Sequence, residues 1–123
     1  MKSITILGAG ESGFGAAMLA HLKGFNVFVS DSNKINEERK SEMTKKSIMF
    51  EEENHSFDKI KLSDFVIKSP GISNSSEIIS KIKSSGIPIV SEIEFASNYS
   101  NSLRYVLLEL MEKLLPQSLS TKY

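Results

Sequence analysis

A glycine-rich segment near the start of the chain has the spacing of a phosphate-binding turn. Gly8, Gly10 and Gly13 fit the pattern G-x-G-x-x-G, and Glu11 and Ser12 lie between the last two glycines. In such a turn the first glycine permits a tight bend, the second lets a ligand reach the backbone, and the third lets helix and strand pack closely. Amides at the start of the following helix would bind a phosphate. The segment predicts a nucleotide site; a glycine turn kept only for packing is the alternative.

Two further polar positions could belong to the same site. Asp31 follows the next apolar run, where an acid can accept hydrogen bonds from a ribose or sugar hydroxyl. The segment Ser69-Pro70-Gly71 ends a later apolar run. Because ligands of open α/β sheets bind along the carboxyl edge of the strands, both positions are expected at the ligand-binding edge. For the second position, a simple turn that ends a strand is the alternative.

Other side chains capable of chemistry form no recognisable catalytic group. Glu92 and Glu94 are two residues apart on a short expected helix, so they point in different directions. We expect one to be a capping acid and the other a surface acid. His21 lies in an expected helix and His55 in a polar loop, and we expect both to be structural or solvated. The sequence therefore predicts neither a catalytic residue nor a metal site in this chain.

Apolar runs and helical patterns alternate along the chain, as they do in α/β domains. The first strand, the glycine turn, the first helix and the second strand form one βαβ unit, expected to be right-handed. The whole pattern predicts a Rossmann-like, doubly wound, mostly parallel five-stranded sheet. We expect strands at residues 4–7, 27–30, 48–50, 64–68 and 87–90, and helices from residue 12, within 33–46, from 75 or 76, and from 91.

Composition excludes several classes of protein. The 123 residues suit one domain with a single core. Zero net charge argues against a nucleic-acid-binding module, and the lack of cysteine excludes a disulfide scaffold and a cysteine-based metal site. No apolar run approaches the roughly 18 residues of a membrane span, and glycines follow the first strand too soon for a signal peptide. We therefore expect a soluble, cytoplasmic domain that binds neither nucleic acid nor a membrane.

Four segments, in order and at suitable spacing, resemble the N-terminal domain of one known family. They are Ile6–Gly13 (ILGAGESG), Val29–Ser32 (VSDS), Ile67–Ile72 (IKSPGI) and Ser91–Phe95 (SEIEF). The family is that of the UDP-N-acetylmuramoyl-L-alanine:D-glutamate ligases, which are Mur ligases of peptidoglycan synthesis. The resemblance covers residues 1–100, and four motifs together are far more specific than the glycine turn alone.

The resemblance implies an ATP-dependent ligase built from three domains. A Rossmann-like domain, here residues 1–100, would bind the UDP end of UDP-N-acetylmuramoyl-L-alanine. A central domain would bind ATP with Mg²⁺, and a third would bind D-glutamate, whose amine attacks an acyl-phosphate formed on the muramoyl-alanine carboxylate. ATP and Mg²⁺ are thus expected as cofactors of the full-length enzyme and not of this chain. The resemblance implies a uridine nucleotide in place of NAD.

The resemblance also implies roles for individual residues. Glu11 and Ser12 occupy the turn that approaches the diphosphate and the uracil. Asp31 and Ser32 belong to the stretch that binds uracil, and Gly71 lies against the nucleotide. Together with the glycines of the turn, they make up the expected substrate-binding set: Gly8, Gly10, Glu11, Ser12, Gly13, Asp31, Ser32 and Gly71.

A stand-alone NAD-binding Rossmann domain, regulatory or oxidoreductase, is the alternative function. The three glycines of the turn and Asp31 would then form the cofactor site. The Ser-Pro-Gly and Ser-Glu-Ile-Glu-Phe motifs count against this alternative, because an NAD site does not require them.

The chain departs from the family pattern at Asn33, where a basic residue is common, and more sharply after residue 100. There the family has a strand and a phosphate loop of the form T-G-T-N-G-K-T-T, whereas residues 103–115 show an amphipathic, leucine-rich pattern. Back-translation from Leu103 with A/T-leaning codons, shifted by two bases, reads K-V-C-F-T-G-T-N-G-K-T-T. We therefore hypothesise that residues 101–123 are an out-of-frame helical tail and that this chain alone has no ligase activity. Coding DNA without that shifted phosphate loop would contradict the hypothesis.

A genuine dimerisation helix is the alternative for the leucine-rich segment; otherwise we expect a monomer, with association only through the tail.

Deleting residues 103–123 distinguishes the two interpretations of the tail. Out-of-frame side chains would not have been selected to pack on the preceding domain, and a short helix without packing is marginal in water. The melting temperature in thermal denaturation should then stay nearly unchanged. A genuine helix would bury several leucines at about 1.5–3 kcal/mol each. A large drop in the melting temperature would therefore favour the dimerisation helix.

Overall fold

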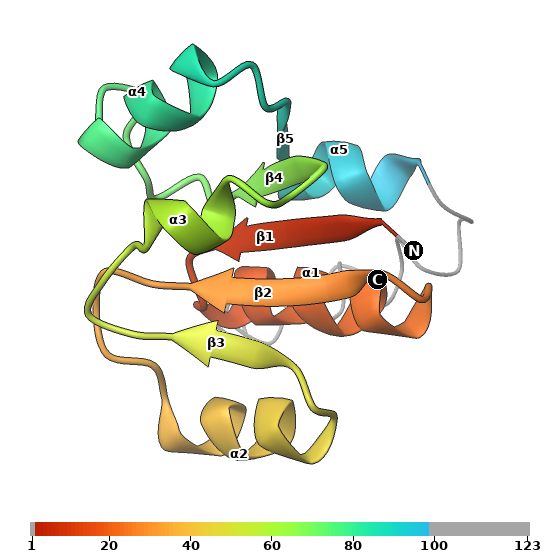
Figure 1. Ribbon diagram of the computed structural model, residues 1–123. Helices are drawn as coiled ribbons and strands as arrows, with labels where there is room; N and C mark the ends of the chain where they lie inside the picture. The colour runs from red at the N-terminus through yellow and green to blue at the C-terminus, as the bar shows by residue number, and fades with distance from the viewer. Residues whose placement is uncertain (1, 99–123) are drawn as a thin grey trace, which may run out of the picture.

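The computed structural model describes residues 2–98, so the expected tail at 101–123 lies outside the described residues. Its centre is a five-stranded sheet in the order β3-β2-β1-β4-β5 (Figure 1). All pairings between its strands are parallel. This arrangement confirms the Rossmann-like, doubly wound fold expected from the sequence. The strands are β1 (Ser3–Leu7), β2 (Asn26–Ser30), β3 (Met49–Glu51), β4 (Phe65–Lys68) and β5 (Ile89–Ser91).

A helix follows each of the five strands, and the helices cover both faces of the sheet. They are α1 (Glu11–Leu22), α2 (Glu37–Lys45), α3 (Phe57–Ile60), α4 (Glu77–Ser84) and α5 (Glu92–Ser97). The strands lie within two residues of the positions expected from the sequence. Because both faces are buried, the central strands read as continuous apolar runs and not as alternating ones. None of the described helices is long and apolar enough to span a bilayer.

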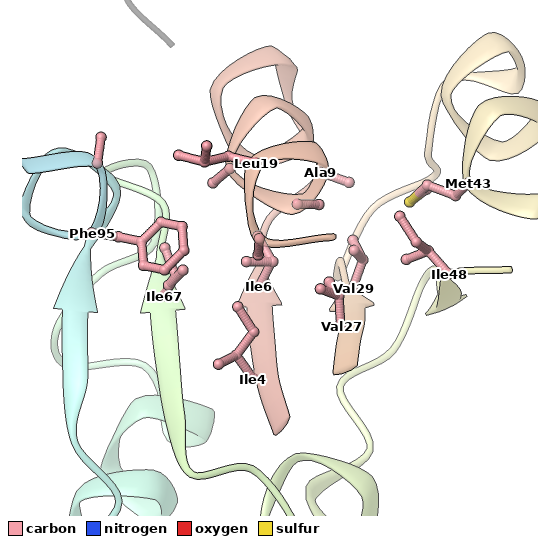
Figure 2. Packing of buried hydrophobic residues seen from close by; sticks show 14 of the residues in the cluster. Ile4, Ile6, Ala9, Leu19, Val27, Val29, Met43, Ile48, Ile67 and Phe95 are labelled. Atoms are coloured by element: carbon pink, nitrogen blue, oxygen red, sulfur yellow. The ribbon is translucent and has the colours of Figure 1, made fainter. Parts of the chain in front are cut away.

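One core lies between the sheet and the helices α1, α2 and α5. Ile4 and Ile6 of β1 lie on this face, where Leu19 of α1 and Phe95 of α5 pack against the strands (Figure 2). Met43 is the buried side chain that α2 contributes; most of its other residues are charged or polar. This agrees with the solvated helix expected within residues 33–46.

A second, smaller core lies between the opposite face and the helices α3 and α4. Leu7 and Val66 meet three isoleucines of α4 and Ile60 of α3 there. Helix α3 was not expected from the sequence. Helix α3 has only four residues, of which Ile60 alone is buried, so it has no apolar periodicity that a sequence pattern could reveal.

The chain reverses its direction across the sheet at the boundary between β1 and β4. Strands β1, β2 and β3 follow one another toward one edge, whereas β4 and β5 extend toward the other. The turns after β1, β2 and β4 therefore meet at one carboxyl edge, next to the point of reversal. Open α/β sheets bind their ligands at this point. The fold thus brings Gly8, Asp31 and Ser69 to the same edge.

Candidate functional site

The glycine turn between β1 and α1 requires glycine at two positions for packing. Gly8 has a φ of +98°, and a Cβ there would lie 2.8 Å from the Cβ of Ser69. At Gly13 a Cβ would overlap the carbonyl oxygen of Gly8. A side chain at either position would therefore push α1 or the Ser-Pro-Gly turn away from the sheet.

Gly10 differs from these two glycines because the protein's own packing does not require it. Its φ of −67° is accessible to any residue, and no atom lies within 4 Å of the position of a Cβ. Gly10 is the N-cap of α1 and comes directly before the first-turn amides, which have no partner within a helix and favour an anion. Glycine at this position keeps the approach to those amides open from outside the chain.

Asp31 braces the glycine turn from the end of β2. Its Oδ2 accepts a hydrogen bond from the Ala9 amide at 2.7 Å, and its Oδ1 accepts one from the Asn33 amide at 2.8 Å. Each carboxylate oxygen has a second lone pair with which it can accept from a ligand. The expected ligand-binding acid is therefore also a structural link between two turns of the site.

Arg39 of α2 supports the same turn from the other side. Its guanidinium donates to the Ala9 carbonyl at 3.3 Å and pairs with the Glu11 carboxylate at 3.5 Å. The pair offsets the negative charge that Glu11 places beside the start of α1, where an anion would bind. Arg39 was not expected at the site, because the polar pattern of its segment indicates only a solvated helix.

A cavity of 480 Å³ opens at the carboxyl edge beside the turns that follow β2 and β4. Its lining includes Ser32 and Gly71, which the sequence placed in one site, together with His55 and Lys81. Glu11 instead lines a separate hollow of 320 Å³ with Arg39. The expected residues thus share one edge of the sheet, but they divide between the cavity and the glycine turn.

His55 is tied into a hydrogen-bonded chain and is not simply solvated. Its Nδ1 lies 2.6 Å from the Oγ of Ser30, which donates to Glu51 at 2.8 Å. Burial lowers the pKa of His55, and the negative charges of Asp31 and Glu51 only partly oppose this. Burial would raise the pKa of Glu51, but hydrogen bonds from Ser56 and Ser30 hold it below its usual value. His55 comes just after β3, a position at the carboxyl edge that could have indicated a role.

The expectation that Glu92 or Glu94 caps the helix is wrong for Glu92. It is not a capping acid, because Ser91 caps α5 by accepting from the Glu94 amide at 3.0 Å. The Glu92 side chain is buried, and its Oε2 has no hydrogen-bond partner among the described residues. Burial raises the pKa of Glu92, opposed by the Ser12 hydroxyl and by the charge of Lys68. A buried acid therefore lies beneath the glycine turn.

Substitutions of the second and third glycines should separate packing from ligand access. In Gly13→Ala the new methyl group overlaps the Gly8 carbonyl, so we expect a loss of about 2 kcal/mol or more in the free energy of unfolding. Gly10→Ala places its methyl group in open space and should leave stability within about 0.5 kcal/mol of the original. Urea denaturation of both variants provides the measurement. Equal stability losses would show that the two glycines do not differ in this way.

Replacement of Glu92 by Gln should stabilise the protein, increasingly so at higher pH. A carboxyl group with a raised pKa in the folded state contributes stability below its unfolded pKa and loses that contribution as the pH rises through the folded pKa. Glu92→Gln removes this loss, so its advantage in melting temperature should grow from pH 5 to pH 8. Glu94→Gln, two residues away and exposed, is the matched control and should show no such trend. Destabilisation by Glu92→Gln at every pH would mean that Ser12 and Lys68 outweigh the burial of the carboxylate.

Comparison with known proteins places this geometry in one family. The model of the MurD N-terminal domain matches residues 3–78. A UDP-N-acetylmuramoylalanine–D-glutamate ligase from Bacteroides thetaiotaomicron is 50% identical over 102 residues, which are 83% of this chain and 23% of that protein. The ligase of the same description from Christiangramia forsetii is 48% identical over 99 residues, 80% of this chain and 22% of that protein. The chain thus spans less than a quarter of the length of these relatives.

Solved structures agree on the fold. A murein peptide ligase from Psychrobacter arcticus has a TM-score of 0.75 at 22% identity, covering 83% of this chain and 21% of that one. A pseudomurein peptide ligase type C from Methanothermus fervidus has a TM-score of 0.72 at 24% identity, covering 81% of this chain and 21% of that one. An imine reductase from Bacillus cereus has a TM-score of only 0.55 at 18% identity, covering 86% of this chain and 38% of that one. Since the family model covers more than half of the chain, this chain belongs to the family of MurD N-terminal domains.

Proposed function

We propose that this chain is the domain that binds the UDP end of UDP-N-acetylmuramoyl-L-alanine in a cytoplasmic ligase that adds D-glutamate during peptidoglycan synthesis. Membership of the MurD N-terminal domain family supports the proposal. So do relatives that are described as UDP-N-acetylmuramoylalanine–D-glutamate ligases and are about half identical over the matched segment. The single structural observation that carries it is the open space at Gly10, beside the free amides of α1.

The two parts of the site suit the two parts of a nucleoside diphosphate. Backbone amides at the start of α1 would bind the diphosphate, with Gly8 and Gly13 shaping the turn and Gly10 admitting the ligand. Ser32 and Gly71 line the cavity that would hold the uridine. Asp31 joins the two parts, because it braces the turn and precedes Ser32. Glu11 and Ser12 would approach the diphosphate from the first turn of α1.

Ligase chemistry is assigned to the full-length enzyme and not to this chain alone. ATP with Mg²⁺ and D-glutamate would bind in parts of the relatives that this chain does not match, which exceed three quarters of their length. We therefore propose that residues 1–100 are the substrate-binding domain and that residues 101–123 are out of frame. The matched segments of 95 to 102 residues are close in length to that domain, which supports this division.

Titration calorimetry with UDP tests the proposed site directly. UDP should bind, and NAD should give no heat of binding. Gly10→Leu should weaken UDP binding at least ~10-fold, because its side chain fills the approach to the α1 amides. Asp31→Ala should cost about 1–3 kcal/mol of UDP binding, since it removes an acceptor and loosens the turn.

Stability measurements on the same variants separate binding from folding. Gly10→Leu projects into open space, so its melting temperature should match that of the parent chain. Asp31→Asn retains one carbonyl acceptor, so its melting temperature should lie between those of the parent chain and Asp31→Ala. Unchanged UDP affinity in both Gly10→Leu and Asp31→Ala would place the nucleotide elsewhere. Binding of NAD in preference to UDP would instead support the alternative function as an NAD-binding domain.

A further inference from the structure

We propose that His55 recognises the base of the nucleotide, through an unprotonated Nε2 that accepts a hydrogen bond from the imide N3–H of uracil. This inference rests on the proposed function and deepens it, since it names the residue that selects uracil. Neither the sequence pattern nor the resemblance gave His55 a role in binding. Recognition by His55 depends on two features of the structure, which are the tautomer of His55 and the cavity that it lines.

The neighbours of Ser30 determine the tautomer of His55. The Ser30 hydroxyl lies 2.8 Å from a Glu51 carboxylate oxygen and 3.1 Å from the Asn54 carbonyl oxygen. Both of these atoms only accept hydrogen bonds when Glu51 is ionised, so the single proton of Ser30 points to one of them. The Ser30 oxygen can therefore only accept a hydrogen bond from His55. The 2.6 Å contact therefore requires a proton on Nδ1 of His55.

A neutral imidazole carries one proton, so Nδ1–H leaves Nε2 as an acceptor. Ser30 is buried in β2, and His55 is partly buried and lines the cavity of 480 Å³. Because Nδ1 is hydrogen-bonded to Ser30, Nε2 is the ring nitrogen that remains for a ligand. Among the groups that line the cavity, Nε2 of His55 is thus an acceptor whose protonation is set by Ser30.

An acceptor at this position distinguishes between the two common pyrimidines. Uracil has an N3–H donor flanked by two carbonyl oxygens, whereas N3 of cytosine is itself an acceptor and would face the Nε2 lone pair. The carbonyl oxygens of uracil need donors, and Lys81 of α4, whose ammonium group can donate, lines the same cavity.

The charges around His55 set the pH dependence of this recognition. Asp31 after β2 and Glu51 of β3 favour its protonated form, but burial outweighs them and keeps the pKa below the usual value. On α4, Lys81 and Glu77 line the same cavity and pair with each other at 3.5 Å. Protonation makes both ring nitrogens donors. The affinity for uracil should therefore be highest above the lowered pKa of His55 and should decrease as the pH falls through that pKa.

Calorimetry of the full 123-residue chain with UDP and CDP, at pH 8 and at a series of lower pH values, tests the inference. The parent chain should bind UDP at least ~10-fold more tightly than CDP at pH 8, as expected for one lost hydrogen bond and one opposed pair of acceptors. His55→Ala should lose most of this preference by weakening UDP binding and not CDP binding. His55→Gln, whose amide oxygen can accept, should restore part of it. Both variants should lose the fall in UDP affinity that protonation of His55 causes as the pH is lowered.

His21→Ala is the matched control, because His21 lies in the last turn of α1 and does not line the cavity. It should retain both the UDP preference and its pH dependence. Partial unfolding of His55→Ala would reduce UDP and CDP binding equally, so the ratio of the two affinities remains informative. If the parent chain does not bind UDP, the proposed function fails. If it binds UDP and His55→Ala keeps the preference and the pH dependence, only the role of His55 is overturned.

Discussion

The closeness of α1 to β1 is the constraint on which the site depends. A Cβ at Gly13 would overlap the Gly8 carbonyl, and one at Gly8 would press on Ser69 of the neighbouring turn. Because the two glycines allow these approaches, the start of α1 lies directly at the carboxyl edge, between the turns that follow β1 and β4. The free amides of the helix then face the point where the chain reverses across the sheet. Any side chain at these positions would move the amides and the Ser-Pro-Gly turn apart.

The acids at this edge of the sheet are arranged in a way that suits the proposed anion site. Asp31 is satisfied by two backbone amides, and Glu11 is paired with Arg39. Glu92 lies beneath the turn, where burial favours its neutral form. Each acid near the start of α1 is therefore engaged, paired or biased toward neutrality. These arrangements reduce the repulsion that a diphosphate would otherwise meet at the helix terminus.

The sequence predicted the fold more completely than the site, for physical reasons. Strands buried on both faces leave continuous apolar runs, and glycine marks the turns, so the order of elements could be inferred. The backbone roles of Gly8 and Gly13 follow from spacing alone. The environment of Glu92 could not be predicted, because acids are seldom buried and its burial depends on how α5 packs beside α1. The partner of His55 lies 25 residues earlier, in a different strand, so no local pattern links the two.

In the proposed site, backbone and side chains have different parts in recognition. The glycine turn presents amides, which suit any phosphate and carry no information about the base. The proposed recognition of the base by His55 requires that the protonation of the ring is set before the ligand arrives, and the buried Ser30 hydroxyl sets it. This hydroxyl can remain buried because it is hydrogen-bonded on both sides, with Glu51 accepting and His55 donating. A residue within β2 therefore sets the tautomer of a ring that lines the cavity, so in the proposed site the same scaffold would hold the diphosphate turn and determine which base the cavity suits.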